Sequence, residues 1–265
     1  MFDNHDTDDI FRGEIIGRKI IFLDSTSSTN DVANEIGSKE NAPEGTVIIA
    51  DEQKSGRGRF GRNWISPPGV NLYFTVILKP TLFLENISII TLAAAVAVAS
   101  SVREYTGLGA EIKWPNDILI HGRKIGGILV EMKSMGERID LLNIGIGLNV
   151  NMQLDTIPEN IRPFTTSLKT ETRTDIDRCS LLNVILNKLE QTYKMILNDA
   201  KQTLINEWIQ LNCTIGKEVS VQSQNSIIRG VADSVNDKGE LLIRLESGKI
   251  ETVNSGEINI LADTK

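Results

Sequence analysis

The chain is poor in cysteine and histidine, with two of each among its 265 residues. Cys179 and Cys213 lie far apart and form no C-x-x-C pair, and neither stands at a usual zinc-site spacing from His5 or His121. The cysteines therefore indicate neither a disulfide framework nor a structural zinc site. A reduced, cytoplasmic location is the simplest expectation.

Long apolar runs and a targeting segment are also lacking. The longest nearly apolar stretch, Ile87–Ala99, is shorter than a bilayer-spanning helix and contains Ser88 and Thr91. The N-terminal segment Met1–Asp9 is acidic, whereas a signal peptide begins with positive charge. The sequence therefore predicts a protein that is neither exported nor inserted in a membrane.

Positive charge is scarce, because 28 Lys and Arg stand against 35 Asp and Glu, for a net charge of −7. Duplex binding depends mostly on neutralisation of phosphates by a basic surface, so we expect no nucleic-acid partner. Hydrophobic residues make up 40% of the chain and charged residues 24%, which is ordinary for a globular protein. The length allows one large domain or one large and one small domain.

One segment departs from this acidic average. Residues 53–64, which read Q-K-S-G-R-G-R-F-G-R-N-W and are called here the basic loop, place Lys54, Arg57, Arg59 and Arg62 among three glycines. Like charges repel and glycine is flexible, so we expect a loop that is mobile until an anion binds. Backbone N–H groups beside glycine and the planar fork of arginine both suit phosphate. A solvated basic surface is the alternative.

Two common phosphate motifs do not explain the basic loop. Gly56, Gly58 and Gly61 satisfy G-x-G-x-x-G after a predicted strand, but Pro67 and Pro68 prevent the helix that a dinucleotide site requires next. A Walker loop ends in Gly-Lys-Ser or Gly-Lys-Thr, and neither occurs here. Both motifs are therefore excluded.

Three ordered blocks resemble the biotin protein ligase family. The segment Gln53–Tyr73 resembles the family signature, Ser28-Thr29-Asn30 precedes it, and Lys113-Trp-Pro-Asn-Asp117 with K-I-G-G-I-L-V-E at 124–131 follows. The resemblance runs from about Lys19 to Ile260. It implies a ligase that activates biotin with ATP as biotinyl-5′-AMP, with Mg²⁺, and then modifies a specific lysine of a biotin carboxyl carrier domain.

The resemblance also implies the site residues. Catalytic roles are expected for Lys113, Arg57 and Arg59, with Lys113 bridging the biotin carboxylate and the α-phosphate. The residues expected to bind biotin are Ser28, Thr29, Asn30, Gln53, Arg57, Gly58, Arg59 and Lys113. The residues expected to bind the nucleotide are Arg57, Arg59, Trp64, Lys113, Asn116 and Asn149. For Lys113 standing alone, a plain surface charge would be the ordinary interpretation.

No metal ligand is assigned with certainty. Asp117 is the one candidate for Mg²⁺, and the preferred alternative is that Asn116 and Asp117 anchor Lys113. Trp64 and Trp114 are more often core residues than ligand-stacking ones, although their places beside the motifs leave a pocket-wall role open. Phe60 stands where some relatives carry a charge.

Local patterns predict an α+β fold in which helices flank a mixed sheet, followed by a small closed C-terminal β barrel, which the family likewise has in SH3-like form. The expected domains are 1–211 and 212–265. Expected strands are 19–24, 46–51, 71–78, 111–113, 118–120, 124–133, 139–150, 218–222, 227–234, 240–245 and 249–253. Expected helices are 30–36, with a cap from the hydroxyl cluster before it, 86–105, 176–197 and 202–211, and 152–175 is expected to be a connection.

Two other functions stay open at this point. Lipoate and octanoate ligases resemble the family in fold and keep a comparable lysine, although this arginine–glycine order is not theirs. A non-enzymatic, biotin-sensing regulator would carry a winged helix ahead of the ligase domain, and only about eighteen residues precede the first predicted strand. A homodimer is common in the family, but no surface stripe predicts one here.

Overall fold

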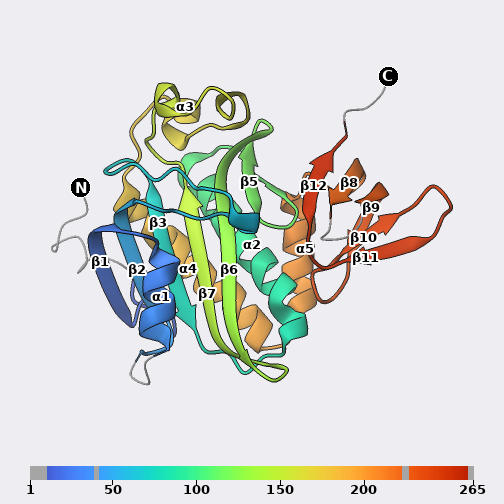
Figure 1. Ribbon diagram of the computed structural model, residues 1–265, viewed down its shortest axis with the longest axis horizontal. Coiled ribbons are helices and arrows are strands. Elements are labelled where there is room, and N and C mark those ends of the chain that lie inside the picture. The colour runs from blue at the N-terminus through green and yellow to red at the C-terminus, as the bar shows by residue number, and fades with distance from the viewer. Residues whose placement is uncertain (1–10, 39–41, 223–226, 262–265) are drawn as a thin grey trace.

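The computed structural model describes residues 11–38, 42–222 and 227–261, so the acidic segment Met1–Asp9 lies outside the described residues. The described residues form two sheets with helices packed against the larger one (Figure 1). This arrangement confirms the predicted α+β class, with a mixed sheet flanked by helices and a separate small C-terminal sheet.

The larger sheet has seven strands in the order β1-β2-β3-β7-β6-β5-β4. Only the β1–β2 pair is parallel, and the other neighbours are antiparallel. Their bounds are β1 Lys19–Thr26, β2 Thr46–Gln53, β3 Leu72–Leu78, β4 Glu111–Lys113, β5 Asp117–Ile120, β6 Arg123–Met135 and β7 Arg138–Leu148. All seven predicted strands are therefore confirmed, with ends that shift by a few residues.

Helices cover the two faces of this sheet unequally. The helices α2 (Ile87–Thr106), α4 (Arg178–Leu197) and α5 (Lys201–Leu211) lie behind the sheet in Figure 1, and the short α1 (Thr29–Gly37) lies in front of its β1–β3 side. The main hydrophobic core belongs to the three-helix face, and a small cluster under α1 includes Ala33 and Ile48. The helix α1 also contacts the front of β7, because Leu141 belongs to the same cluster and Asn143 Nδ2 donates to Asn34 Oδ1 at 2.8 Å.

The apolar helix α2 is longer than the apolar run Ile87–Ala99 that the sequence suggested. Its helical stretch Leu84–Thr106 is long and apolar enough to cross a membrane by length and composition, so shortness does not exclude a span. The physical reason to regard it as a core helix is burial, since 78% of its most apolar window is buried in the fold. Alanines on this helix allow close packing against the sheet, as predicted.

Two short elements and one cap differ from the predictions. The segment expected to be a plain connection contains α3 (Leu168–Thr172), whose first turn is capped by the Ser167 hydroxyl accepting from Thr170 N. The strand β12 (Glu257–Ile260) was not predicted, and it forms by pairing with β8. Ser28 does stand at the N-cap of α1, but its side chain makes no capping hydrogen bond.

The C-terminal strands form a barrel-like sheet in the order β11-β10-β9-β8-β12, so β11 and β12 are its edges. The remaining bounds are β8 Glu218–Gln222, β9 Ile227–Val235, β10 Leu241–Arg244 and β11 Ile250–Val253. Trp114 connects this sheet to the larger one, because its backbone N donates to Thr214 Oγ1 at 2.9 Å and its Nε1 donates to the Gly239 carbonyl at 3.3 Å. The domain boundary at 211/212 stays a prediction.

Candidate active site

A single cavity of about 580 Å³ collects side chains from α1, β2, the basic loop, β4–β7, the segment 152–165 and the C-terminal sheet. Its size is typical of a small-molecule site. Every residue that the sequence suggested for the site lines it: Ser28, Thr29, Asn30, Gln53, Arg57, Gly58, Arg59, Trp64, Lys113, Asn116, Asp117 and Asn149. Residues spread over more than a hundred positions are therefore brought together.

Hydroxyl and amide groups from α1 and β2 form one connected chain of hydrogen bonds. The backbone N and the hydroxyl of Thr29 donate to Gln53 Oε1 at 2.9 and 3.2 Å, and Gln53 Nε2 donates to Ser66 Oγ at 3.1 Å. Thr75 Oγ1 lies 2.8 Å from Thr29 Oγ1 and 2.6 Å from Asn30 Oδ1. These buried polar groups suit a ligand that both donates and accepts hydrogen bonds.

The basic loop has a defined path in the structure. Gly58 N donates to Arg62 O at 2.7 Å, and Trp64 N donates to Gly56 O at 2.8 Å. Between these bonds Phe60 adopts a left-handed backbone with φ of 56°, and its side chain is 60% exposed. The prediction that the loop is mobile without ligand stays a prediction.

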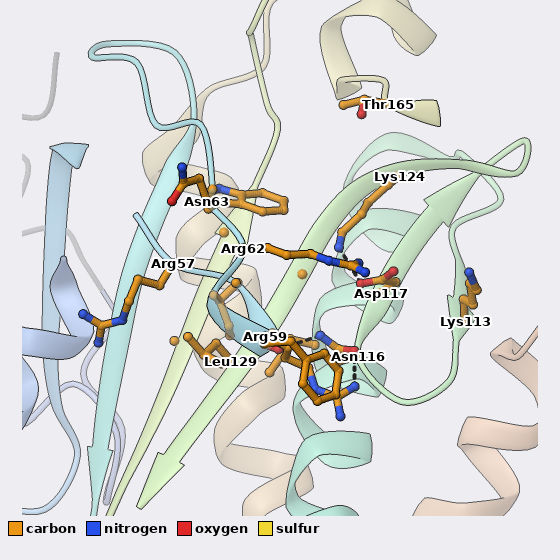
Figure 2. Close-up of a pocket in the computed structure, with 18 of the residues that line it drawn as sticks. Arg57, Arg59, Arg62, Asn63, Lys113, Asn116, Asp117, Lys124, Leu129 and Thr165 are labelled. Atoms are coloured by element: carbon orange, nitrogen blue, oxygen red, sulfur yellow. Dashed lines mark hydrogen bonds and ion pairs between the residues drawn. The ribbon is translucent and has the colours of Figure 1, made fainter. Parts of the chain in front are cut away.

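Two arginines of the loop reach other parts of the fold. Arg59 Nη1 donates to Asn116 Oδ1 at 3.1 Å and to the Gly256 carbonyl at 3.2 Å, and Figure 2 shows the contact with Asn116. Arg62 forms an ion pair with Glu257 on β12. Burial lowers the pKa of Arg59, and the hydrogen bond from Arg62 lowers the pKa of Glu257. The loop is therefore joined to the C-terminal sheet by both residues.

Two lysines line the cavity in different surroundings. Lys124 Nζ lies 2.5 Å from Asp117 Oδ1 and 5.4 Å from the centre of the Trp64 ring, whereas Lys113 stands apart on β4 (Figure 2). The expectation that Asn116 and Asp117 anchor Lys113 is wrong for this structure, because these side chains bind Arg59 and Lys124 instead. Lys113, Asn116 and Asp117 are close in sequence, but the sequence does not show which side chains they contact in the folded protein.

Trp64 and Trp114 take different roles. Trp114 is 1% exposed and belongs to the core, which is the more common place for a tryptophan. Trp64 is only partly buried and lines the cavity, where it rests on the glycines of β6 and β7. Its Nε1 atom is buried and has no hydrogen-bond partner among the described residues.

Asn149, which was predicted to bind the nucleotide, lies just after β7 and shortly before the segment 152–165. Its side chain donates to the Thr166 carbonyl at 3.1 Å, so it holds this segment against the end of β7. The segment contributes apolar side chains to the cavity from Met152, Ile157, Ile161 and Phe164. An apolar wall of this kind suits a flat aromatic group such as a purine.

The residues present do not form a protein-held site for Mg²⁺. No group of three or more His, Cys, Asp or Glu side chains that could hold a metal occurs within residues 11–38, 42–222 and 227–261. The cavity carboxylates Asp117 and Glu257 are already paired with Lys124 and Arg62. Mg²⁺ with few protein ligands is usually carried by substrate phosphates.

Several lining residues were not singled out from the sequence. Lys124 stood in a recognised block but had no assigned role, and its position at the start of a hairpin strand was the only signal. Arg62 belonged to the basic loop, whereas its partner Glu257 lay in a segment with no predicted strand. Gly145 and Gly147 left no signal, because a glycine that makes room for another side chain looks like any other glycine.

Comparison with known proteins agrees with this geometry. The model of the "Biotin/lipoate A/B protein ligase family" matches residues 22–151, and that of the "Biotin protein ligase C terminal domain" matches residues 214–261. The chain is also 36% identical over 247 residues to the bifunctional ligase/repressor BirA of Bacillus spizizenii, which covers 93% of this chain and 75% of that protein. The chain belongs to the biotin protein ligase family.

Other relatives of this biotin protein ligase family member support the same assignment. A biotin--[acetyl-CoA-carboxylase] ligase of Mycobacterium tuberculosis is 30% identical over 258 residues, covering 93% of this chain and 92% of that protein. A biotin protein ligase from Aquifex aeolicus, solved in complex with biotin and ATP, superposes with a TM-score of 0.79 at 30% identity. The superposition covers 92% of this chain and 99% of that one.

Proposed function

We propose that this chain is an ATP-dependent ligase that makes biotinyl-5′-AMP and transfers biotin to a specific lysine of a biotin carboxyl carrier domain. The observation that carries the proposal is the single cavity, which unites a buried hydroxyl–amide chain with the cations of the basic loop. Support also comes from the relative named for acetyl-CoA carboxylase and from the Aquifex structure with biotin and ATP.

The polar chain is the part of the cavity that suits the ureido ring of biotin. Thr29 and Asn30 are buried and Gln53 is partly buried, so a ligand that enters here without matching donors and acceptors would shield these polar groups from water without bonding to them. The apolar wall of segment 152–165 suits the adenine ring, and Trp64 adds an aromatic face over the glycines of β6 and β7.

In the first step, a biotin carboxylate oxygen attacks the α-phosphorus of ATP. An O–P bond forms, the bond from the α-phosphorus to the bridging oxygen breaks, and pyrophosphate leaves with the electron pair. In the second step, the neutral amine of the acceptor lysine attacks the anhydride carbonyl, loses a proton and displaces AMP. Negative charge develops on phosphate or carbonyl oxygens in both steps, so fixed cations lower the barrier.

Two lysines are candidates for the cation that bridges carboxylate and α-phosphate. Lys113 was predicted from the sequence and lines the cavity. Lys124 also lines it, and its contacts with Asp117 and Trp64 hold its ammonium in a defined place in the cavity (Figure 2). A positioned charge stabilises a transition state better than a mobile one, which favours Lys124.

The lipoate ligase alternative belongs to the same broad family, whose model name includes both cofactors. The buried polar chain disfavours it, since the dithiolane ring of lipoate has no N–H donor for these acceptors. The expectations of a cytoplasmic location, no nucleic-acid partner and no membrane partner stay predictions, as does the homodimer. The regulator alternative would require duplex binding, which a gel shift in moderate salt would reveal.

The direct test combines the protein with biotin, ATP, Mg²⁺ and a biotin carboxyl carrier domain, followed by intact mass measurement. We expect one biotin-sized increment on the carrier domain and none when its acceptor lysine is replaced by arginine. Lipoate in place of biotin is the specificity control. A carrier domain that gains no mass, with pyrophosphate release no faster than without biotin, would refute the proposal.

A second experiment separates the two lysines. Lys113→Ala and Lys124→Ala are compared by pyrophosphate release, with Lys54→Ala as the control because its side chain is a loop cation that does not line the cavity. Loss of the bridging cation should slow adenylate formation about a hundredfold or more. Whichever lysine shows this loss with an unchanged melting temperature carries the role, and wild-type rates in both would exclude a bridging lysine.

A further inference from the structure

The guanidinium of Arg57 is occupied on the side of α1 and β6. Its Nη1 lies 2.5 Å from Oδ1 of Asp31 in the first turn of α1, and its Nη2 lies 3.2 Å from Oε1 of Glu131 on β6. Figure 2 shows the Arg57 side chain pointing away from Arg59, Asn116 and Lys124. Arg57 therefore lines the cavity, but its guanidinium binds Asp31 and Glu131 and does not point toward Arg59.

The local charge balance argues against phosphate binding at this guanidinium. One cation faces two carboxylates, so an added phosphate or carboxylate would be repelled at short range. Arg59 is different, because it donates hydrogen bonds to the neutral oxygens of Asn116 and Gly256. Asp117 and Glu257 act on Arg59 electrostatically, but neither forms an ion pair with it among the described residues, so Arg59 suits an added anion better than Arg57 does.

Glu131 links the same group to the floor of the cavity. Its Oε2 accepts from Asn30 Nδ2 at 3.0 Å, and Asn30 Oδ1 in turn accepts from Thr75 Oγ1 at 2.6 Å. Asn30 is 3% exposed and lies directly on β7, since a Cβ added at Gly145 would be 2.3 Å from its Oδ1. The position of a cavity amide thus depends on the carboxylate that Arg57 holds.

We propose that Arg57 is a positioning residue, which fastens the basic loop to α1 and β6 through Asp31 and Glu131 and thereby orients Asn30 toward biotin. The inference rests on the proposed function, because it names biotin as the ligand that Asn30 meets. It assigns Arg57 a different task from Arg59, although the two residues stand two positions apart in one motif. Fastening and ligand contact are thus divided between neighbouring arginines.

The first test needs no substrate. Chymotrypsin cleavage after the exposed Phe60 reports loop opening, and the fragments are identified by intact mass. We expect faster cleavage in Arg57→Gln and in Glu131→Gln than in the wild type. Lys54→Gln is the matched control, because it removes a cation from the same loop and should cleave at the wild-type rate. Cleavage that is unchanged in both variants would overturn the fastening.

The second test is a double-mutant cycle on the kinetics of adenylate formation. Each single change should raise the KM for biotin about tenfold, while the KM for ATP changes much less, because a small displacement of a positioned group has a large effect. Independent effects would multiply to about a hundredfold, whereas the double variant should be no worse than the poorer single variant, so the two effects should be coupled by about tenfold. Arg57→Lys should recover part of the loss by pairing with one carboxylate.

A direct phosphate contact predicts different results. Arg57→Gln would then raise the KM for ATP by the same factor with and without Glu131→Gln, and this outcome would overturn the inference. If the wild type does not adenylate biotin, the proposed function fails, whereas the cleavage experiment still decides whether Arg57 fastens the loop. The two failures are therefore distinguishable.

Discussion

Gly147 on β7 makes room for the indole of Trp64, and its replacement by alanine should impair catalysis. A Cβ built at Gly147 lies 2.5 Å from Trp64 Nε1 and 2.6 Å from Cε2. Ordinary van der Waals contact begins at 3.4 Å, so the indole must move by about 1 Å. A misplacement of this size in an active site costs up to about a hundredfold in rate.

The matched control adds the same methyl group to the same floor without a clash. A Cβ at Gly127 on β6 would lie 3.4 Å from Lys124 Cε and Nζ and 3.5 Å from Trp64 Cζ3, which are ordinary contacts. We therefore expect Gly127→Ala to change kcat/KM for adenylate formation by less than about threefold. Gly147→Ala should lower it by about tenfold to a hundredfold.

The assay is pyrophosphate release at varied biotin and ATP, together with the melting temperature of each variant. Because Trp64 borders a cavity and can move into it, we expect the rate to fall more than the stability. The reasoning is refuted if the two variants have equal rates. It is also refuted if strain goes into the sheet, so that Gly147→Ala loses about 1–3 kcal/mol of unfolding free energy at a normal rate.

Four further predictions concern other parts of the molecule. Glu257→Gln should lower the melting temperature at pH 7 but not in acid, because Arg62 lowers the pKa of Glu257 in the folded state and the resulting stabilisation is lost as pH falls below its ordinary 4.5. Equal differences at both pH values would contradict this. Glu190→Gln should cost about 1–3 kcal/mol in urea denaturation, because the buried carboxylate accepts from the backbone N–H groups of residues 14, 15 and 16, and the glutamine amide leaves some of them unpaired. Lipoate should be adenylated at least about a hundredfold less efficiently than biotin, since its dithiolane ring brings no N–H donor to the acceptors Gln53 Oε1 and Asn30 Oδ1, and comparable turnover would overturn this assignment. Arg59→Gly should still make the adenylate but release it, so streptavidin blots should show labelled serum albumin added as a bystander, and its absence would count against retention by the loop.

Elements with strong local signals were predicted closely. The strand β4 ends before Pro115 and β8 lies between turns, and both have the predicted bounds. The short α3 and β12 were missed because neither carries enough residues for a periodic pattern. The strand β12 exists through its pairing with β8, about forty residues earlier, and a local pattern cannot show such a partner.

The candidate residues show the same division. The order of three motifs sufficed to select side chains that all line one cavity. It did not show that Asp117 pairs with Lys124, or that Glu131 receives Arg57, because these pairs depend on which strands are neighbours. Burial alone separates Trp114, a core residue, from Trp64, which faces the cavity.

For the basic loop, the sequence by itself determined the charges, the glycines and hence the chemistry of the ligand that the loop suits. It also predicted repulsion among the loop cations, but only the tertiary structure shows that carboxylates pair with two of them. Asp31, Glu131 and Glu257, from α1, β6 and β12, lie against Arg57 and Arg62. Electrostatic energy depends on the distance between charges in space, and the fold brings together groups up to 197 residues apart in the chain.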